Sequence, residues 1–315
     1  CGVVLLCLFA FASTAVAQPY GYSVNSRGNL PDSNDVNALW KINLTDGSSE
    51  RVSDQGLPTG FLDLEALAFN PEGEMYGADD DLKTLVRVST VTGVASAVGG
   101  STINMGRPLG DNMDFGMAFN CDGRAFVVSD VEQSLFSADT QTGALTLVGQ
   151  AGNFGVPITD IAIFGEYVFG IGVGLDGEGN ALAPNLYRID LDTVSAEVVG
   201  PLGAEASPYN NAGLSFDENG QLWAITDRRQ VGGQDHPSEI LNINPQTGEA
   251  TRVAVTSIVG LESLAVAPPQ GCELPAMPLR TDGFAIPVNQ PFALWILGVL
   301  VLVLGAFSVR MGGKL

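Results

Sequence analysis

The sequence predicts an all-β protein: a five-bladed β-propeller followed by a single C-terminal transmembrane helix. Three observations lead to this prediction. A short hairpin phrase recurs five times, a second pair of alternating strands precedes most of its copies, and an uncharged apolar run occupies residues 291–309. Repeats of about 40 to 50 residues with four strands each are typical of propellers, and about 20 apolar residues span a bilayer as a helix.

The hairpin phrase is clearest in "DTQTGALTLVG", where an alternating strand leads into a tight turn and a second strand. Its five copies occupy residues 43–52, 89–99, 139–149, 190–200 and 244–253. Four copies place a glycine in the turn, at Gly47, Gly93, Gly143 and Gly248, where a positive φ is expected. Val194 takes that place in the fourth copy, which predicts a turn of another type.

Small side chains recur on one strand of each unit. They are Ala68, Ala118, Ala162, Ser215 and Ala265, flanked on one side by Leu67, Met117, Ile161, Leu214 and Leu264 and on the other by Phe69, Phe119, Ile163, Phe216 and Val266. The small residues predict innermost strands that crowd around a common axis, and the large ones are expected to fill the space between sheets.

Ring closure follows from the count of units. The last such strand, residues 260–268, has no hairpin after it, and the first hairpin, residues 39–52, has no such strand before it. Joining the two makes the fifth blade from both chain ends and leaves no open sheet edge. The alternative is a six-bladed ring, with an extra unit inside spacers 101–112 or 172–184.

The two ends predict an exported, anchored protein. Residues 1–17 form an uncharged apolar run that closes on the small-x-small triplet Ala15-Val16-Ala17, as in a signal peptide. The propeller is expected over 18–268, a linker over 269–290, a transmembrane helix over 291–309 and a short basic cytoplasmic tail over 310–315. The basic residues after the span place the body outside the cytoplasm, at the cell envelope or cell surface.

The net charge and the histidine content argue against two classes of function. The chain has 35 acidic and 14 basic residues, and its formal charge of -21 argues against nucleic acid as a partner and favours cations. His236 is the only histidine, so histidine-ligated metal sites and Ser-His-Asp catalysis have little support.

Acidic or amide residues stand near the start of each innermost strand. They are Glu65, Asp114, Asp160, Asn211 and Glu262. We expect them at one mouth of the central channel, where they could bind a divalent cation or supply the acid and base of a glycoside hydrolase or lactonase. The alternative is that they cap backbone groups and solvate the opening.

Two further sets of residues are candidates. Asp176, Glu178 and Asn180 alternate in a glycine-rich loop, a spacing that suits Ca²⁺, although an ordinary solvated turn explains it as well. Cys121 and Cys272 remain after removal of the signal peptide, and two cysteines in an exported chain predict a disulfide.

The repeated phrases, such as "LYRID" and "GLSFDENGQLWAITD", resemble the secreted bacterial propellers of the NHL and YVTN type. The tail "AIPVNQPFALWILGVLVLVLGAFSVRMGGKL" resembles the IPTL-CTERM class of sorting signals, and Ile286 and Pro287 match the head of its motif. The first resemblance implies a propeller without an assigned activity. The second implies a sorting or processing enzyme that acts on the tail.

These observations favour a binding or display module over an enzyme, with an unidentified extracytoplasmic ligand and the membrane as partners. No cofactor is required, although Ca²⁺ fits the acidic residues. The alternative function is a periplasmic or surface hydrolase or lactonase that uses the channel-mouth carboxylates and a divalent cation.

Overall fold

The computed structural model describes residues 18–25, 37–52, 60–110, 113–176, 179–229 and 231–267. Within these ranges the regular structure consists of twenty β-strands and one short 3-10 turn, Val98–Gly100. The strands form five four-stranded antiparallel sheets, which we call blades I to V.

Four strands follow one another in each blade from the channel to the outside. Blade I is β20 (Ala265–Ala267), β1 (Tyr20–Val24), β2 (Leu39–Asn43) and β3 (Ser49–Arg51); blade II is β4 (Leu64–Phe69), β5 (Met75–Asp79), β6 (Thr84–Val88) and β7 (Ala95–Ala97). Blade III is β8 (Phe115–Phe119), β9 (Ala125–Ser129), β10 (Ser134–Ala138) and β11 (Leu145–Val148). Blade IV is β12 (Ile158–Phe164), β13 (Tyr167–Gly172), β14 (Asn185–Asp190) and β15 (Ser195–Pro201); blade V is β16 (Ala212–Phe216), β17 (Leu222–Thr226), β18 (Glu239–Ile243) and β19 (Ala250–Val255).

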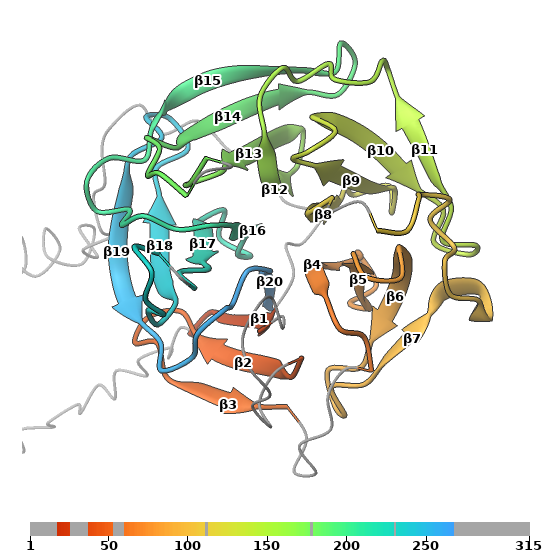
Figure 1. Ribbon diagram of the computed structural model, residues 1–315, viewed down its shortest axis with the longest axis horizontal. Coiled ribbons are helices and arrows are strands. Elements are labelled where there is room, and N and C mark those ends of the chain that lie inside the picture. The colour runs from red at the N-terminus through yellow and green to blue at the C-terminus, as the bar shows by residue number, and fades with distance from the viewer. Residues whose placement is uncertain are drawn as a thin grey trace, which may run out of the picture. The chain divides into compact units, whose positions relative to one another are not determined.

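The blades form a closed ring with their innermost strands around the axis (Figure 1). Each innermost strand contacts the next, and β20 contacts β4 to complete the circle. Blade I is shared by distant parts of the chain, because β20 pairs with β1 and Ala267 stands opposite Tyr20. The prediction of five blades with a shared closing blade is confirmed. The described parts of the two spacers add no strand to a sheet, so a sixth blade is not formed there.

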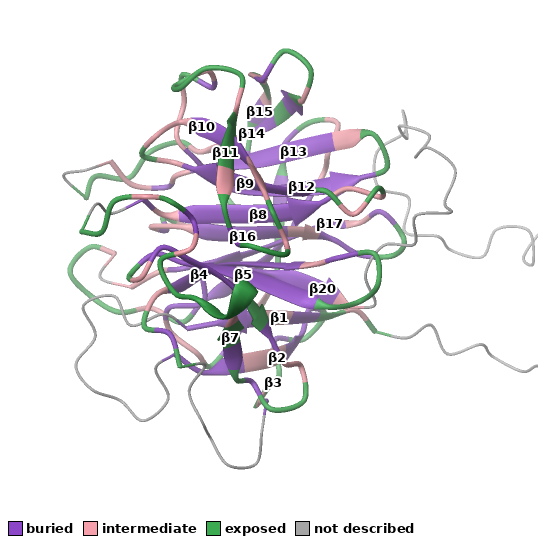
Figure 2. Ribbon diagram, turned by 90° about the vertical axis from the view of Figure 1, so that its right-hand side faces the viewer, coloured by how far each residue is buried: buried purple, intermediate pink, exposed green. Residues whose placement is uncertain are grey.

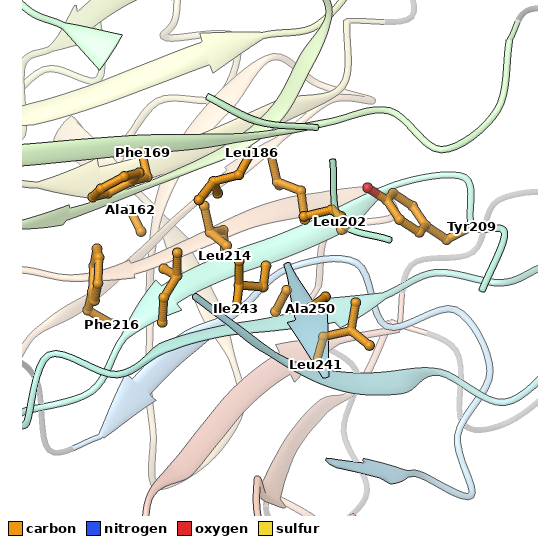
Figure 3. Packing of buried hydrophobic residues seen from close by; sticks show 14 of the residues in the cluster. Ala162, Phe169, Leu186, Leu202, Tyr209, Leu214, Phe216, Leu241, Ile243 and Ala250 are labelled. Carbon is orange, nitrogen blue, oxygen red and sulfur yellow. The ribbon is translucent and has the colours of Figure 1, made fainter. Parts of the chain in front are cut away.

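Five apolar clusters fill the five spaces between blades, and buried residues continue through every blade (Figure 2). Figure 3 shows the space between blades IV and V, where Ala162 and Phe169 face Leu214 and Phe216. The rings of Phe169 and Phe216 pack edge to face at 5.9 Å. Four of the small residues predicted to line the axis, Ala68, Ala118, Ala162 and Ala265, therefore also pack in the clusters between blades.

The repeated turn holds neighbouring blades together. Gly248 has φ +79, and a Cβ at this position would lie 2.4 Å from the carbonyl oxygen of Gly200 in the preceding blade. Val194 has φ 52, so the prediction of a different turn type in the fourth copy is wrong. Val194 is buried against blade III, and its side chain occupies the space beside Gly149. Burial of the valine offsets the strain of its left-handed backbone.

No helix among the described residues is long and apolar enough to cross a membrane. The expected signal peptide (1–17), linker (269–290), transmembrane helix (291–309) and tail (310–315) lie outside the described residues. These assignments stay predictions.

Candidate functional site

The innermost strands all begin at the same end of the channel, which we call the mouth. A group of ionisable residues, the mouth cluster, gathers there from strand starts and from the turns that follow the second strands. Its members are Asp63, Glu65, Asp79, Asp80, Lys83, Asp114, Asp130, Asp227, Arg229 and Glu262. Eight carboxyl groups thus share two basic side chains.

Three carboxyl groups of this cluster converge on one point. One oxygen each of Asp63, Glu65 and Glu262 lies within 4.8 Å of the others. A β-bulge between Leu64 and Ala66 turns Glu65 out of the regular alternation of β4. Oxygen ligands stand about 2.3 to 2.6 Å from Ca²⁺, so two of them on opposite sides of one ion are about 4.6 to 5.2 Å apart. The spacing of the three oxygens therefore suits a shared cation.

Hydrogen bonds and ion pairs hold these carboxylates in place. The Phe115 amide of the next blade donates to Glu65 Oε2 at 2.9 Å. Arg229 Nη2 lies 2.8 Å from Glu262 Oε2 and also 2.8 Å from Asp227. The guanidinium thus ties blade V to the closing blade at the mouth.

Burial, together with nearby like charges, raises the pKa values of several carboxyl groups in the cluster. Burial, with the charge of Asp80 next in size, raises the pKa of Asp63 to about 6. Burial also raises the pKa of Glu65 well above its usual range, with Asp114 and Asp63 adding to it. The pKa of Asp130 rises to about 8, again from burial first and Asp114 second. A bound divalent cation would oppose these shifts because it favours the ionised carboxylates.

Four of the five residues predicted at the mouth come together there. Asn211 Nδ2 donates to Asp114 Oδ2 at 2.9 Å, while Glu65 and Glu262 belong to the convergent trio. Asp160 is different, because it lies in the wall of the ring and is 2% exposed.

The carboxylate of Asp160 joins three blades. Its Oδ1 accepts two hydrogen bonds of 2.8 Å. One comes from the backbone amide of Met117 in β8 and the other from the amide of Ile161, the next residue in the chain. Its Oδ2 accepts the Leu214 amide from β16 at 2.6 Å. The innermost strands are so close here that a Cβ on Gly116 would lie 2.3 Å from the Asp160 Cα. Burial raises the pKa of Asp160, and the three N–H donors act in the opposite direction.

Sequence reasoning missed Asp63, Asp80, Asp130, Asp227 and Arg229. A signal for three of them was present, because the second strand of three units ends in acid, as "GADD", "VVSD" and "AITD". These strands run antiparallel to the innermost ones, so their ends reach the mouth.

The remaining candidates lie elsewhere. Asp176 accepts hydrogen bonds from the backbone and side chain of Asn180, at 2.7 and 2.9 Å, which closes the loop on itself. Glu178 lies outside the described residues, so the calcium loop stays a prediction. His236 Nε2 lies 3.2 Å from the carbonyl of Val231, and the His236 backbone amide donates to the carbonyl of Arg228 at 3.1 Å.

Cys121 is disulfide-bonded. Its predicted partner, Cys272, lies outside the described residues, so that pairing stays a prediction.

Below the mouth the channel becomes apolar. Its walls carry the predicted columns of large and small side chains, among them Leu67, Met117 and Phe216. A charged ligand would lose hydration there without gaining a charged side-chain partner, so it should stay at the mouth.

The titration of Asp130 predicts a pH-dependent stability. The folded pKa of about 8 exceeds the ordinary aspartate value of 3.8, so the native state keeps a proton that the unfolded chain releases. This contribution to stability is complete below about pH 4 and is lost as the pH rises to about 8. We expect Asp130→Asn to lose less stability than the wild type between pH 6 and 8, measured as a smaller fall in Tm. The exposed Asp122→Asn should follow the wild type, and identical pH profiles for all three proteins would contradict the assignment.

No family model and no curated protein sequence matches this chain. Solved structures do resemble it. One is a chain in a nidogen/laminin complex, with 11% identity over 80% of this chain and 99% of that chain and a TM-score of 0.48. Another is an inactive variant of virginiamycin B lyase from Staphylococcus aureus with quinupristin, with 14% identity over 78% of this chain and 73% of that chain and a TM-score of 0.40.

A third is the glutaminyl cyclase of Myxococcus xanthus, with 17% identity over 61% of this chain and 69% of that chain and a TM-score of 0.40. Identities and TM-scores this low carry no functional argument.

Proposed function

We propose that the protein is an exported β-propeller binding module whose mouth holds a divalent cation, with Ca²⁺ the best fit. The observation that carries the proposal is the convergence of Asp63, Glu65 and Glu262 within 4.8 Å. An all-oxygen set of carboxylates suits Ca²⁺ or Mg²⁺ rather than a softer metal. The ion would leave coordination positions for oxygen atoms of an extracytoplasmic ligand. Export is supported by the signal-like residues 1–17 and the apolar residues 291–309.

Calorimetric titration with CaCl2 tests the cation. The full chain, in non-ionic detergent micelles and stripped of metal, should bind Ca²⁺ saturably. Binding should release protons, because burial raises the pKa values of Asp63 and Glu65 and a bound cation favours the ionised carboxylates. The measured heat should therefore depend on the ionisation enthalpy of the buffer.

Matched variants locate the ion. Glu65→Gln keeps an oxygen for the Phe115 amide but loses one charge, and we expect at least a tenfold weaker Ca²⁺ affinity. Asp122→Asn removes an exposed carboxylate outside the mouth and should leave affinity unchanged. No saturable heat at millimolar Ca²⁺, or equal affinities in both variants, would refute the cation site.

A hydrolase or lactonase is the second candidate. It is favoured by the pKa values of Asp63 and Asp130, about 6 and about 8, which lie on either side of neutrality as a general base and a general acid require. Turnover of aryl glycosides or γ-lactones by the wild type, lost in Asp130→Asn, would favour this reading. Ca²⁺ binding without turnover favours the binding module.

A further inference from the structure

Exposed aliphatic side chains are concentrated on one part of the mouth side. Leu62, Ile103, Leu109 and Val131 are 48%, 48%, 52% and 58% exposed. All four belong to loops at the mouth end of blades II and III. Among the described residues, the mouth loops of the other three blades expose only one large aliphatic side chain, Leu182. We call the four residues the II–III rim.

Backbone hydrogen bonds connect the loops that carry the first two rim residues. In the turn after β5, the amide of Asp80 donates to the carbonyl of Asp63 at 2.8 Å, and Asp63 directly follows Leu62 in the chain. Ile103 donates its own amide to Thr84 Oγ1 at the start of β6, at 3.0 Å. The loops of Leu62 and Ile103 are therefore fixed to the same turn.

The other two rim residues are joined by an ion pair. Arg107, two residues from Leu109, pairs with Glu132, which follows Val131. This pair links the loop between blades II and III to the turn after β9. The loops that carry the four aliphatic residues are thus held together by fixed contacts.

The same surface is acidic. Both of its cations are already paired, Lys83 with Asp80 and Arg107 with Glu132. Asp81 and Asp114 form no ion pair with any described residue. Aliphatic contacts beside uncompensated negative charge complement a chain segment that carries both apolar and basic side chains. An anionic lipid surface would be repelled.

We infer that the II–III rim is a docking surface for a cationic amphipathic segment of another protein. Basic side chains of the partner face Asp81 and Asp114, while its apolar side chains cover Leu62, Ile103, Leu109 and Val131. The inference goes beyond the cation site, because it needs neither Glu65 nor Glu262. Docking should persist in EDTA and weaken as the salt concentration rises.

Photo-crosslinking tests the surface in the full chain, in non-ionic detergent with EDTA. The probe is a synthetic peptide of leucine and lysine that carries a benzophenone group, and the control peptide has serine in place of each leucine. We expect adducts of the leucine peptide to map by mass spectrometry to residues 101–110 and 129–133. The serine peptide should give at least fivefold less adduct.

Variants separate docking from nonspecific attraction to an acidic protein. Leu109→Ser with Val131→Ser should lower the adduct yield at least fivefold. Val91→Ser, which changes an 81% exposed valine at the opposite end of blade II, should leave the yield unchanged. Equal adduct yields in the double serine variant and in Val91→Ser, or adducts that map elsewhere, would overturn the inference. Binding to phosphatidylcholine vesicles that depends on the rim, without peptide adducts, would overturn it in favour of a lipid surface.

Discussion

A chain that lacks residues 18–52 is expected to show no cooperative unfolding transition. The deletion removes β1, β2 and β3 and leaves β20 without its only strand partner. It also opens the apolar clusters on both sides of blade I. A propeller with one blade missing has two exposed sheet edges and two uncovered apolar faces.

The size of the effect follows from burial. Val24, Leu39, Ile42 and Leu44 are all fully buried in the two clusters of blade I. Burying one such side chain stabilises a fold by about 1.5 to 3 kcal/mol, so the four together contribute about 6 to 12 kcal/mol. The net stability of a domain is about 5 to 15 kcal/mol, so their loss should unfold the ring.

A permuted chain is the matched control. Tyr20 and Ala267 are opposite each other in adjacent strands, so a short loop can join residue 267 to residue 20 in a chain that begins at residue 60. This chain keeps all four strands of blade I and should melt cooperatively near the wild-type temperature, whereas the deletion should not. Differential scanning calorimetry under reducing conditions compares them. A sharp, unshifted transition in the deletion would disprove ring closure as the source of stability.

The ring could be predicted from the sequence because the repeated hairpin phrase occurs five times at a nearly regular spacing. Turn glycines and strand alternation are local signals, and the unpaired strand at 260–268 fixed the closure by simple counting. Val194 shows the limit of local reasoning. Its side chain packs into a space beside Gly149 of the preceding blade, and no property of the turn itself indicates that space.

The site was only partly predictable for the same reason. Glu65 and Glu262 could be placed at the mouth from their position at strand starts, but Asp63 joins them through a bulge in β4 that the alternation does not show. Asp160 had the same sequence position as the mouth residues. Its side chain instead meets amides of two neighbouring blades, and this arrangement depends on how closely the innermost strands approach.

Replacing Asp160 with alanine should destabilise the ring more than any single change in the mouth cluster. Three backbone amides, those of Met117, Ile161 and Leu214, would lose their acceptor in the interior. A buried donor left unsatisfied costs about 1 to 3 kcal/mol. We expect the free energy of unfolding to fall by about 3 to 5 kcal/mol, measured by urea denaturation. The free energy of unfolding of Asp160→Asn should lie between those of the wild type and Asp160→Ala. The amide oxygen of the asparagine can accept from two of the donors, while its NH2 group faces the third.

Asp217 provides the comparison that shows whether position within the ring matters. It is also buried, and its carboxylate accepts the amides of Asn219 and Gln221 and the indole N–H of Trp223, all within blade V. Asp217→Ala therefore removes the same number of hydrogen bonds, but in a turn at the bottom of one blade where water can replace them. We expect a loss of about 1 to 2 kcal/mol there. Since Asp160 joins β8, β12 and β16, its loss should in addition lower the cooperativity of unfolding, seen as a smaller m-value. Equal destabilisation by the two alanine variants, with unchanged m-values, would show that Asp160 acts only within its own blade.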